Sequence, residues 1–248
     1  MKAPLVRRIA ALVAAAATPC VVIAVAVFFF LNPIWVAFDQ DRSGVDRLTG
    51  YTTAQVRDVT GSILSDLVFG PPKFEATLPG AAAPVLDASE RGHMADVRTV
   101  LMDLGAVALI AAILLLLVGS IARGRRWFWR AVAAGARLLI AGVVVVGLGF
   151  ALFFDQAFEL FHEIFFAPGT YMFDPRTEKL VQLFPDQFWS ETSVALAGSI
   201  LVLAILVAIG ATRLGRAPEP GTADGVLAAV PPPQARPEPQ APPAGTAQ

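Results

Sequence analysis

The sequence predicts an all-α membrane protein: a four-transmembrane-helix bundle with a small extracytoplasmic cap formed by two outer loops. Hydrophobic residues make up 56% of the chain and charged residues only 16%, which is unlike the composition of soluble domains. Four apolar runs are long enough to cross a bilayer, over residues 9–31, 99–121, 131–154 and 192–212. Each should be a helix, because lipid offers the backbone no hydrogen-bond partner.

The basic residues predict how this bundle is oriented. They gather before the first run, between the second and third runs, and after the fourth: Lys2, Arg7, Arg8, Arg123, Arg125, Arg126, Arg130, Arg213 and Arg216. Such segments stay on the cytoplasmic side. We therefore expect a multi-pass protein of the cell membrane, with cytoplasmic termini and with residues 32–98 and 155–191 outside. The aromatic residues among the arginines indicate an inner-leaflet anchor, so we expect no nucleic-acid site.

The first outer segment should contain one short helix. Residues 39–50 are polar and indicate a loop. Thr52 or Thr53 can cap a helix that carries an apolar stripe on one face, made of Val56, Val59, Ile63 and Leu67. Gly70, Pro71 and Pro72 should end it. Further on, Ser89 is the expected N-cap of a helix that continues into the second run.

The last two runs and the C-terminal segment add two expectations. Gly142, Gly147 and Gly149 lie in the third run and permit close packing against another helix. Residues 213–248 are rich in proline, alanine and glycine. They cannot bury a hydrophobic core, so we expect a membrane domain that ends at residue 212 and a disordered cytoplasmic tail.

The chain has only two histidines, and both should lie at the outer mouth of a span. On a helix, Glu159 and His162 share a face with Asp155, and Phe161 and Phe165 lie beside them. This arrangement favours acid–base chemistry on an amphiphile. The same stretch is also typical of an amphipathic interfacial anchor with an incidental histidine.

The second histidine, His93, precedes the second run. Asp96 follows it by three positions, so its carboxylate can hydrogen-bond the ring. Together with Glu159 and Glu163, the two histidines could hold a metal, but no metal-binding spacing is present: His162-Glu163 begins like a metalloprotease motif that has Phe166 in place of its second histidine. We therefore expect no metal, and general acid–base and oxyanion chemistry by imidazole without a covalent intermediate.

Four segments resemble the motifs of a domain-of-unknown-function family of integral membrane proteins that includes Lit, the lipoprotein intramolecular transacylases. These are residues 90–98, 161–166, 171–175 and 183–189. The resemblance covers roughly residues 10–212. It implies four helices, an extracytoplasmic cap and two catalytic histidines, which by motif are His93 and His162.

The resemblance also implies a reaction. The sn-2 acyl chain of a diacylglyceryl lipoprotein, held in the outer leaflet, moves to the amino group of that lipoprotein's N-terminal cysteine without a cofactor. Asp96, Glu159 and Glu163 would orient the imidazoles. The substrate would contact aromatic walls, together with membrane lipids: Phe161, Phe165, Phe166, Tyr171, Phe188 and Trp189. Two alternatives stay open: another histidine-dependent acyl transfer or hydrolysis on a membrane lipid, and a non-enzymatic membrane scaffold.

Overall fold

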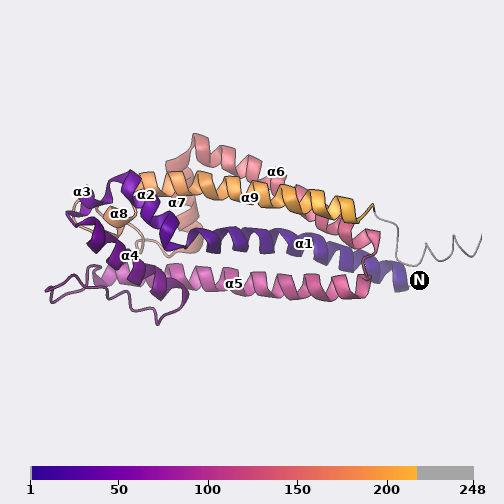
Figure 1. Cartoon of the computed structure of the whole chain (residues 1–248), viewed down its shortest axis with the longest axis horizontal. Coiled ribbons are helices and arrows are strands. Elements are labelled where there is room, and N and C mark those ends of the chain that lie inside the picture. The colour runs from indigo at the N-terminus through magenta and orange to yellow at the C-terminus, as the bar shows by residue number, and fades with distance from the viewer. Residues whose placement is uncertain (1, 217–248) are drawn as a thin grey trace, which may run out of the picture.

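Four long helices form the body of the molecule. The structure is a computed structural model that describes residues 2–216, and within this range it contains helices and no strands. The long helices are α1 (Lys2–Phe30), α5 (Ala88–Ala122), α6 (Arg126–Leu152) and α9 (Asp186–Leu214), which run along one another (Figure 1). Each is long and apolar enough to cross a membrane. The predicted all-α fold with four spanning helices is therefore confirmed.

The helix that contains the fourth predicted span extends two residues beyond it. α9 continues to Leu214, whereas the sequence predicted that the membrane domain ends at residue 212. Residues 217–248, which make up most of the predicted tail, lie outside the described residues.

Small residues let the long helices approach one another. α1 packs against α5, α6 and α9, and α6 packs against α9. The buried positions between them are largely alanines, including Ala14, Ala136 and Ala204, which are 0% exposed. A Cβ atom added at Gly135 would lie 2.1 Å from the carbonyl oxygen of Ala15, so α6 meets α1 there at backbone distance.

The glycines chosen from the sequence do not make such contacts. An added Cβ at Gly142, Gly147 or Gly149 would meet nothing within 4 Å. The expectation of close packing at these three positions is not met among the described residues. A sequence pattern of glycines does not identify which face of a helix meets a neighbour.

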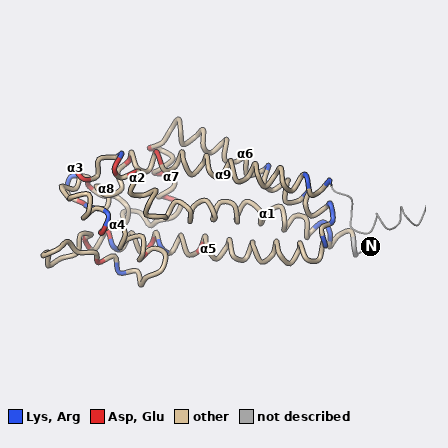
Figure 2. Tube along the Cα trace, in the orientation of Figure 1, with Lys and Arg blue, Asp and Glu red and all other residues tan. Residues whose placement is uncertain are grey.

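The shorter helices gather at the end of the bundle away from the N-terminus and form the cap (Figure 1). They are α2 (Pro33–Ser43), α3 (Val45–Thr49), α4 (Thr53–Val68), α7 (Phe154–Phe165) and α8 (Lys179–Leu183). α7 is separated from α6 by a break at Phe153, whose φ and ψ of −139° and 52° are not helical. Asp and Glu residues lie towards this cap, whereas the charged residues at the opposite end of the described chain are Lys and Arg alone (Figure 2).

The predicted loop over residues 39–50 is wrong, because α2 and α3 occupy most of it. α2 begins at Asn32, whose side chain accepts a hydrogen bond from the backbone N–H of Trp35, and Pro33 occupies the first turn. Two of its polar residues, Asp39 and Gln40, are buried. Gln40 is 2% exposed and donates to the hydroxyl of Thr60 and to the carbonyl oxygen of Leu183. Because these partners are remote in sequence, the sequence itself shows only a polar segment, and a polar segment is typical of a loop.

Helix α4 matches its prediction, and the start of α5 differs from its prediction by two residues. Thr52 caps α4 in a capping box with Gln55, and the stripe of Val56, Val59, Ile63 and Leu67 is buried. α5, however, is capped by Asp87 and not by Ser89. Asp87 accepts from the N–H of Glu90 while the Glu90 carboxylate accepts from the N–H of Asp87, and this reciprocal pair fixes the start of the helix.

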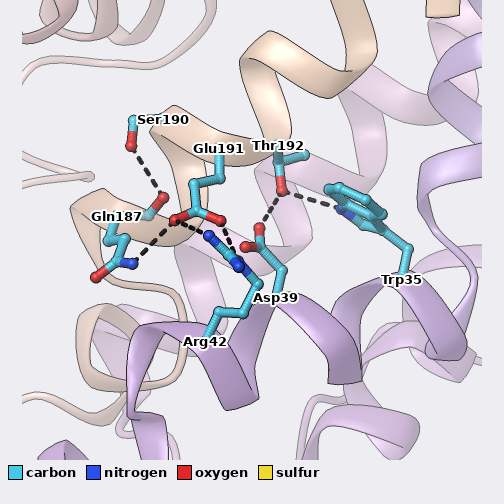
Figure 3. Close-up of polar contacts among 7 residues, drawn as sticks. All are labelled: Trp35, Asp39, Arg42, Gln187, Ser190, Glu191 and Thr192. Atoms are coloured by element: carbon cyan, nitrogen blue, oxygen red, sulfur yellow. Dashed lines mark hydrogen bonds and ion pairs between the residues drawn. The ribbon is translucent and has the colours of Figure 1, made fainter.

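A polar network ties α2 to the first turns of α9 (Figure 3). The indole N–H of Trp35 donates to the Thr192 hydroxyl at 3.1 Å, and that hydroxyl donates to Asp39 Oδ2 at 2.7 Å. Beside it, Arg42 and Glu191 form an ion pair at 2.7 Å. Asp39 is 0% exposed. Because burial disfavours its charged form, the pKa of Asp39 is raised to about 6.

Candidate active site

The two histidines lie against each other where the cap meets the bundle. His93 is on α5 and His162 is on α7. Their ring centroids are 6.0 Å apart and the rings are nearly parallel. The imidazole pair therefore brings together two helices that are separated in sequence by α6.

His93 is held by the cap. Glu90, one turn earlier on α5, is 2% exposed and accepts from the backbone N–H of Leu180 on α8 as well as from that of Asp87. The His93 ring is 7% exposed, and its centroid lies 4.7 Å from that of Phe166 and 5.6 Å from that of Phe173. Its Nδ1 atom is buried without a hydrogen-bond partner among the described residues.

The buried surroundings keep His93 neutral. This residue lies in the first turns of α5, before residues 99–121, which the sequence predicts to span the membrane. Burial is the main reason that its pKa falls to about 4. The neighbouring His162 lowers the pKa further, and the carboxylate of Asp96 opposes the shift.

His162 is oriented by its own helix. Its Nδ1 atom lies 2.8 Å from the carbonyl oxygen of Phe158, one turn earlier in α7. A carbonyl oxygen only accepts, so Nδ1 is the protonated nitrogen of the neutral ring and Nε2 carries the lone pair. The sequence suggested a carboxylate for this orienting contact, and the backbone makes it instead.

Aromatic side chains surround the two imidazoles. The His162 centroid lies 4.4 Å from that of Phe158, 5.1 Å from Tyr171, 5.4 Å from Phe161 and 5.5 Å from Phe166. Phe166 therefore contacts both histidine rings. The arrangement forms an apolar wall around the two imidazoles, which suits proton transfer with restricted access of water.

The other aromatic residues chosen from the sequence lie further from the imidazoles. Phe165 packs against Phe161 and is 49% exposed. Trp189 reaches Phe158, at 6.1 Å between centroids. Phe188 is 4% exposed and packs in the core of the cap against Phe184.

The three acids chosen as orienting residues do not bond to the rings. Asp96 and Glu163 are exposed. Glu159 accepts a hydrogen bond at 3.3 Å from the hydroxyl of Tyr171, whose ring faces His162. Over residues 2–216, no group of three or more His, Cys, Asp or Glu side chains is placed to hold a metal ion.

Sequence reasoning missed two contributors to this site. Phe173 contacts His93 from the segment after α7; it lies within the motif-like segment 171–175 but was not chosen as a site residue. Glu90 fixes the turn that carries His93. Its capping-box spacing after Asp87 was a signal that could have been used.

Comparison with known proteins gives one consistent result. The family model described as lipoprotein intramolecular transacylase Lit matches residues 12–189. No curated protein sequence matches the chain. The membrane-integral lipoprotein intramolecular transacylase Lit from Bacillus cereus has a similar solved structure, with a TM-score of 0.73 and 19% identity over 85% of this chain and 96% of that one.

A second solved structure of the same Bacillus cereus protein, with one histidine replaced by arginine, is also similar. It has a TM-score of 0.68 and 18% identity over 91% of this chain and 96% of that one. At such low identity these likenesses establish a shared fold.

Proposed function

Because the chain belongs to the lipoprotein intramolecular transacylase (Lit) family, we propose that it moves the sn-2 acyl chain of a diacylglyceryl lipoprotein to the amino group of that lipoprotein's N-terminal cysteine. The product is a lyso-form lipoprotein. The observation that carries the proposal is the pair of imidazoles, 6.0 Å apart at the end of an apolar bundle and inside an aromatic wall.

His162 is the proposed general base. With its proton on Nδ1 bonded to the Phe158 carbonyl, its Nε2 lone pair removes a proton from the cysteine amine. The amine nitrogen attacks the carbonyl carbon of the sn-2 ester. A carbon–nitrogen bond forms, and the carbonyl oxygen becomes an oxyanion.

His93 is the proposed oxyanion partner. Since its pKa is lowered to about 4, its ring stays neutral at neutral pH and offers one N–H to the developing negative charge. The intermediate then collapses and the carbon–oxygen bond of the ester breaks. The departing glyceryl oxygen takes the proton held by His162, so one proton moves from nitrogen to oxygen and both imidazoles return to their starting state.

The aromatic wall should favour attack on the ester by the amine over attack by water. Hydrolysis of the ester would waste the acyl chain, and water must therefore be kept from the carbonyl carbon. Phe166 contacts both rings and is 8% exposed, and Phe158, Phe161 and Tyr171 close the surroundings of His162. Amine and ester belong to one substrate, so confinement also supplies the proximity that an intramolecular transfer needs.

We further infer that the cap and the site face the outer leaflet of the cytoplasmic membrane, with both termini in the cytoplasm. The charge distribution supports this orientation. At the end opposite the cap, the described chain carries Lys and Arg without Asp or Glu (Figure 2), and basic loops are retained on the cytoplasmic side. A substrate anchored by its acyl chains would enter from the bilayer.

The test is mass spectrometry of a lipoprotein's N-terminal peptide from a host that lacks other N-acylating enzymes. The host would carry the wild-type protein, His93→Ala, His162→Ala, or Asp58→Asn as a control at an exposed position of α4. We expect N-acyl, lyso-glyceryl cysteine with the wild type and the control, and diacylglyceryl cysteine with a free amine with both histidine variants.

Two results would contradict the proposal. A free amine on diacylglyceryl cysteine in the presence of well-expressed wild type would exclude the transfer for that lipoprotein. It would then favour acyl chemistry on other membrane lipids or a scaffold. Full conversion by either histidine variant would exclude that imidazole from the reaction.

A further inference from the structure

We propose that residues 69–73, the loop that follows α4, insert into the headgroup layer of the membrane on the cap side, with Phe69 as the inserted side chain. Phe69 is 87% exposed, the largest exposed fraction among the large hydrophobic residues described. This loop, here called the Phe69 loop, makes no contact with the imidazole pair. The inference does not depend on the proposed reaction.

The Phe69 loop has no unsatisfied backbone donor. The N–H groups of Phe69 and Gly70 both donate to the carbonyl oxygen of Ser65, each at 2.8 Å, and that of Lys73 donates to the carbonyl oxygen of Pro71 at 2.8 Å. The two remaining residues are prolines, Pro71 and Pro72, which have no N–H. An unpaired N–H group is costly to remove from water, and with these three donors paired and two prolines the loop presents none.

The loop is also held in one conformation. Phe74, the residue after it, has a φ of 52°, which is in the left-handed region that residues with a side chain seldom adopt. Its ring is 0% exposed in the core of the cap, and its N–H donates to Asp66 Oδ2 at 2.8 Å. Since both ends of the loop are fixed, Phe69 projects as a consequence of the fold.

The contacts of α4 place the Phe69 loop at the level of the membrane surface. Arg98 of α5 donates from Nη1 to the carbonyl oxygen of Asp66, near the end of α4. Counting from Arg98 to Arg123 gives 25 residues (123 − 98) of helix α5 and its C-cap, or about 37 Å at a rise of about 1.5 Å per residue. The hydrocarbon layer is about 30 Å thick and the bilayer about 40–45 Å with its headgroups.

With Arg123 at one membrane surface, Arg98 therefore reaches the headgroup layer at the other. Phe69 follows Asp66 by three residues and lies at a similar depth. Lys73 is exposed at the end of the same loop. An exposed aromatic ring and an exposed lysine in one loop suit this layer, because the ring would meet the upper acyl chains while the ammonium would meet the phosphates.

The experiment measures the depth of residue 69 in liposomes of phosphatidylcholine and phosphatidylglycerol. Cys20 is the only cysteine, so a Cys20→Ser background accepts one nitroxide label at Phe69→Cys. Label accessibility to oxygen, which concentrates in lipid, is compared with accessibility to a water-soluble nickel chelate. Phe69 is largely exposed, so its replacement removes little packing and should leave the fold intact.

Two matched positions calibrate the measurement. Leu109→Cys is 63% exposed on the spanning part of α5 and gives the value for lipid. Leu48→Cys is 49% exposed on α3, which lies far from the bundle (Figure 1), and gives the value for water. We expect the oxygen-to-nickel ratio at residue 69 to exceed that at residue 48 severalfold and to fall between the two controls.

A ratio at residue 69 equal to that at residue 48 would overturn the proposal, because the loop would then stand in water. A low accessibility to both reagents would also overturn it, since that result indicates burial against protein. The transacylase assay is a separate measurement, so the failure of either proposal can be recognised without reference to the other.

Discussion

The Nδ1 atom of His162 and the carbonyl oxygen of Phe158 are 2.8 Å apart, one turn from each other in α7. This bond determines which nitrogen of the imidazole is free to act as a base. We predict that neutral His162 carries its proton on Nδ1, because the carbonyl can only accept.

Nitrogen-15 NMR of histidine-labelled protein in liposomes tests this tautomer. The chain has two histidines, so the spectrum contains two imidazoles, and His93→Gln assigns them. The expected signal of neutral His162 is a protonated Nδ1 with an unprotonated Nε2. A protonated Nε2 would contradict both the bond and the proposed role as base.

Phe166 should control how the acyl chain is partitioned between the amine and water. Its ring lies 4.7 Å from that of His93 and 5.5 Å from that of His162, so Phe166→Ala opens the wall at the reacting atoms. We expect less N-acyl product and more lyso-lipoprotein with a free amine, which is the product of hydrolysis. The ratio of N-acyl product to hydrolysis product for Phe166→Leu should lie between the ratios for wild type and Phe166→Ala.

Mass spectrometry of the two lyso products gives this ratio directly. Leu160→Ala is the control, because Leu160 lies on the same helix with 55% of its surface exposed. An unchanged ratio in Phe166→Ala would show that water is excluded by other groups.

Stability should depend on pH through His93. Its pKa is about 4 in the folded protein against 6.5 for a free side chain. As the pH falls from about 6.5 to 4, this histidine is protonated in the unfolded chain but stays neutral in the folded protein. The free energy of unfolding therefore decreases, by roughly 3 kcal/mol over the whole interval. We expect the melting temperature of wild type to fall more steeply on acidification than that of His93→Leu.

The difference between wild type and His93→Leu isolates the contribution of His93. Asp39 and Glu90 have raised pKa values and change stability in the opposite direction, but they do so in both proteins. Parallel melting curves for wild type and His93→Leu between pH 4 and 6.5 would contradict a buried, neutral His93.

Asp39 should make the protein less stable as the pH rises. Its pKa is raised from 3.8 to about 6 by burial, so the folded state holds a proton that the unfolded chain releases, and stability falls between about pH 4 and pH 6. Asp39→Asn keeps an oxygen for the Thr192 hydroxyl and cannot ionise. We expect this variant to be more stable than wild type above pH 6, by an amount on the order of 1–3 kcal/mol.

Thermal unfolding of the purified protein at several pH values checks this expectation. Asp39→Ala also removes the charge but loses the bond to Thr192, and it should be less stable than Asp39→Asn. Asp58→Asn, at an exposed position, should follow wild type. A destabilised Asp39→Asn at pH 7 would mean that the charge itself is required.

Two glycines of α6 should respond oppositely to the same substitution. Gly135→Ala brings a methyl group to 2.1 Å from the Ala15 carbonyl oxygen, which forces α6 and α1 apart and should cost about 1–3 kcal/mol. Gly142→Ala meets nothing within 4 Å and should gain about 0.5–1 kcal/mol from lower chain entropy. Melting temperatures in detergent compare the two. Equal effects would contradict the observed helix contact.

The sequence by itself determined the features that depend on local pattern. Apolar length identified the four spans, because backbone groups in lipid must be satisfied within a helix. The 3.6-residue period identified the stripe of α4, and all four of its residues are buried. Both histidines, and several of the aromatic residues around them, were recognised as candidates from their spacing and from the family resemblance.

The tertiary structure decided what depends on partners remote in the chain. The second half of α2 fell in the predicted loop over residues 39–50, because the sequence does not reveal that Gln40 bonds to Leu183, 143 positions away. Gly135 and Gly142 are chemically identical, and only the position of α1 makes one of them a close contact. The same holds for the site: His93 and His162 lie on different helices, and the break at Phe153 together with the packing of the cap brings their rings to 6.0 Å.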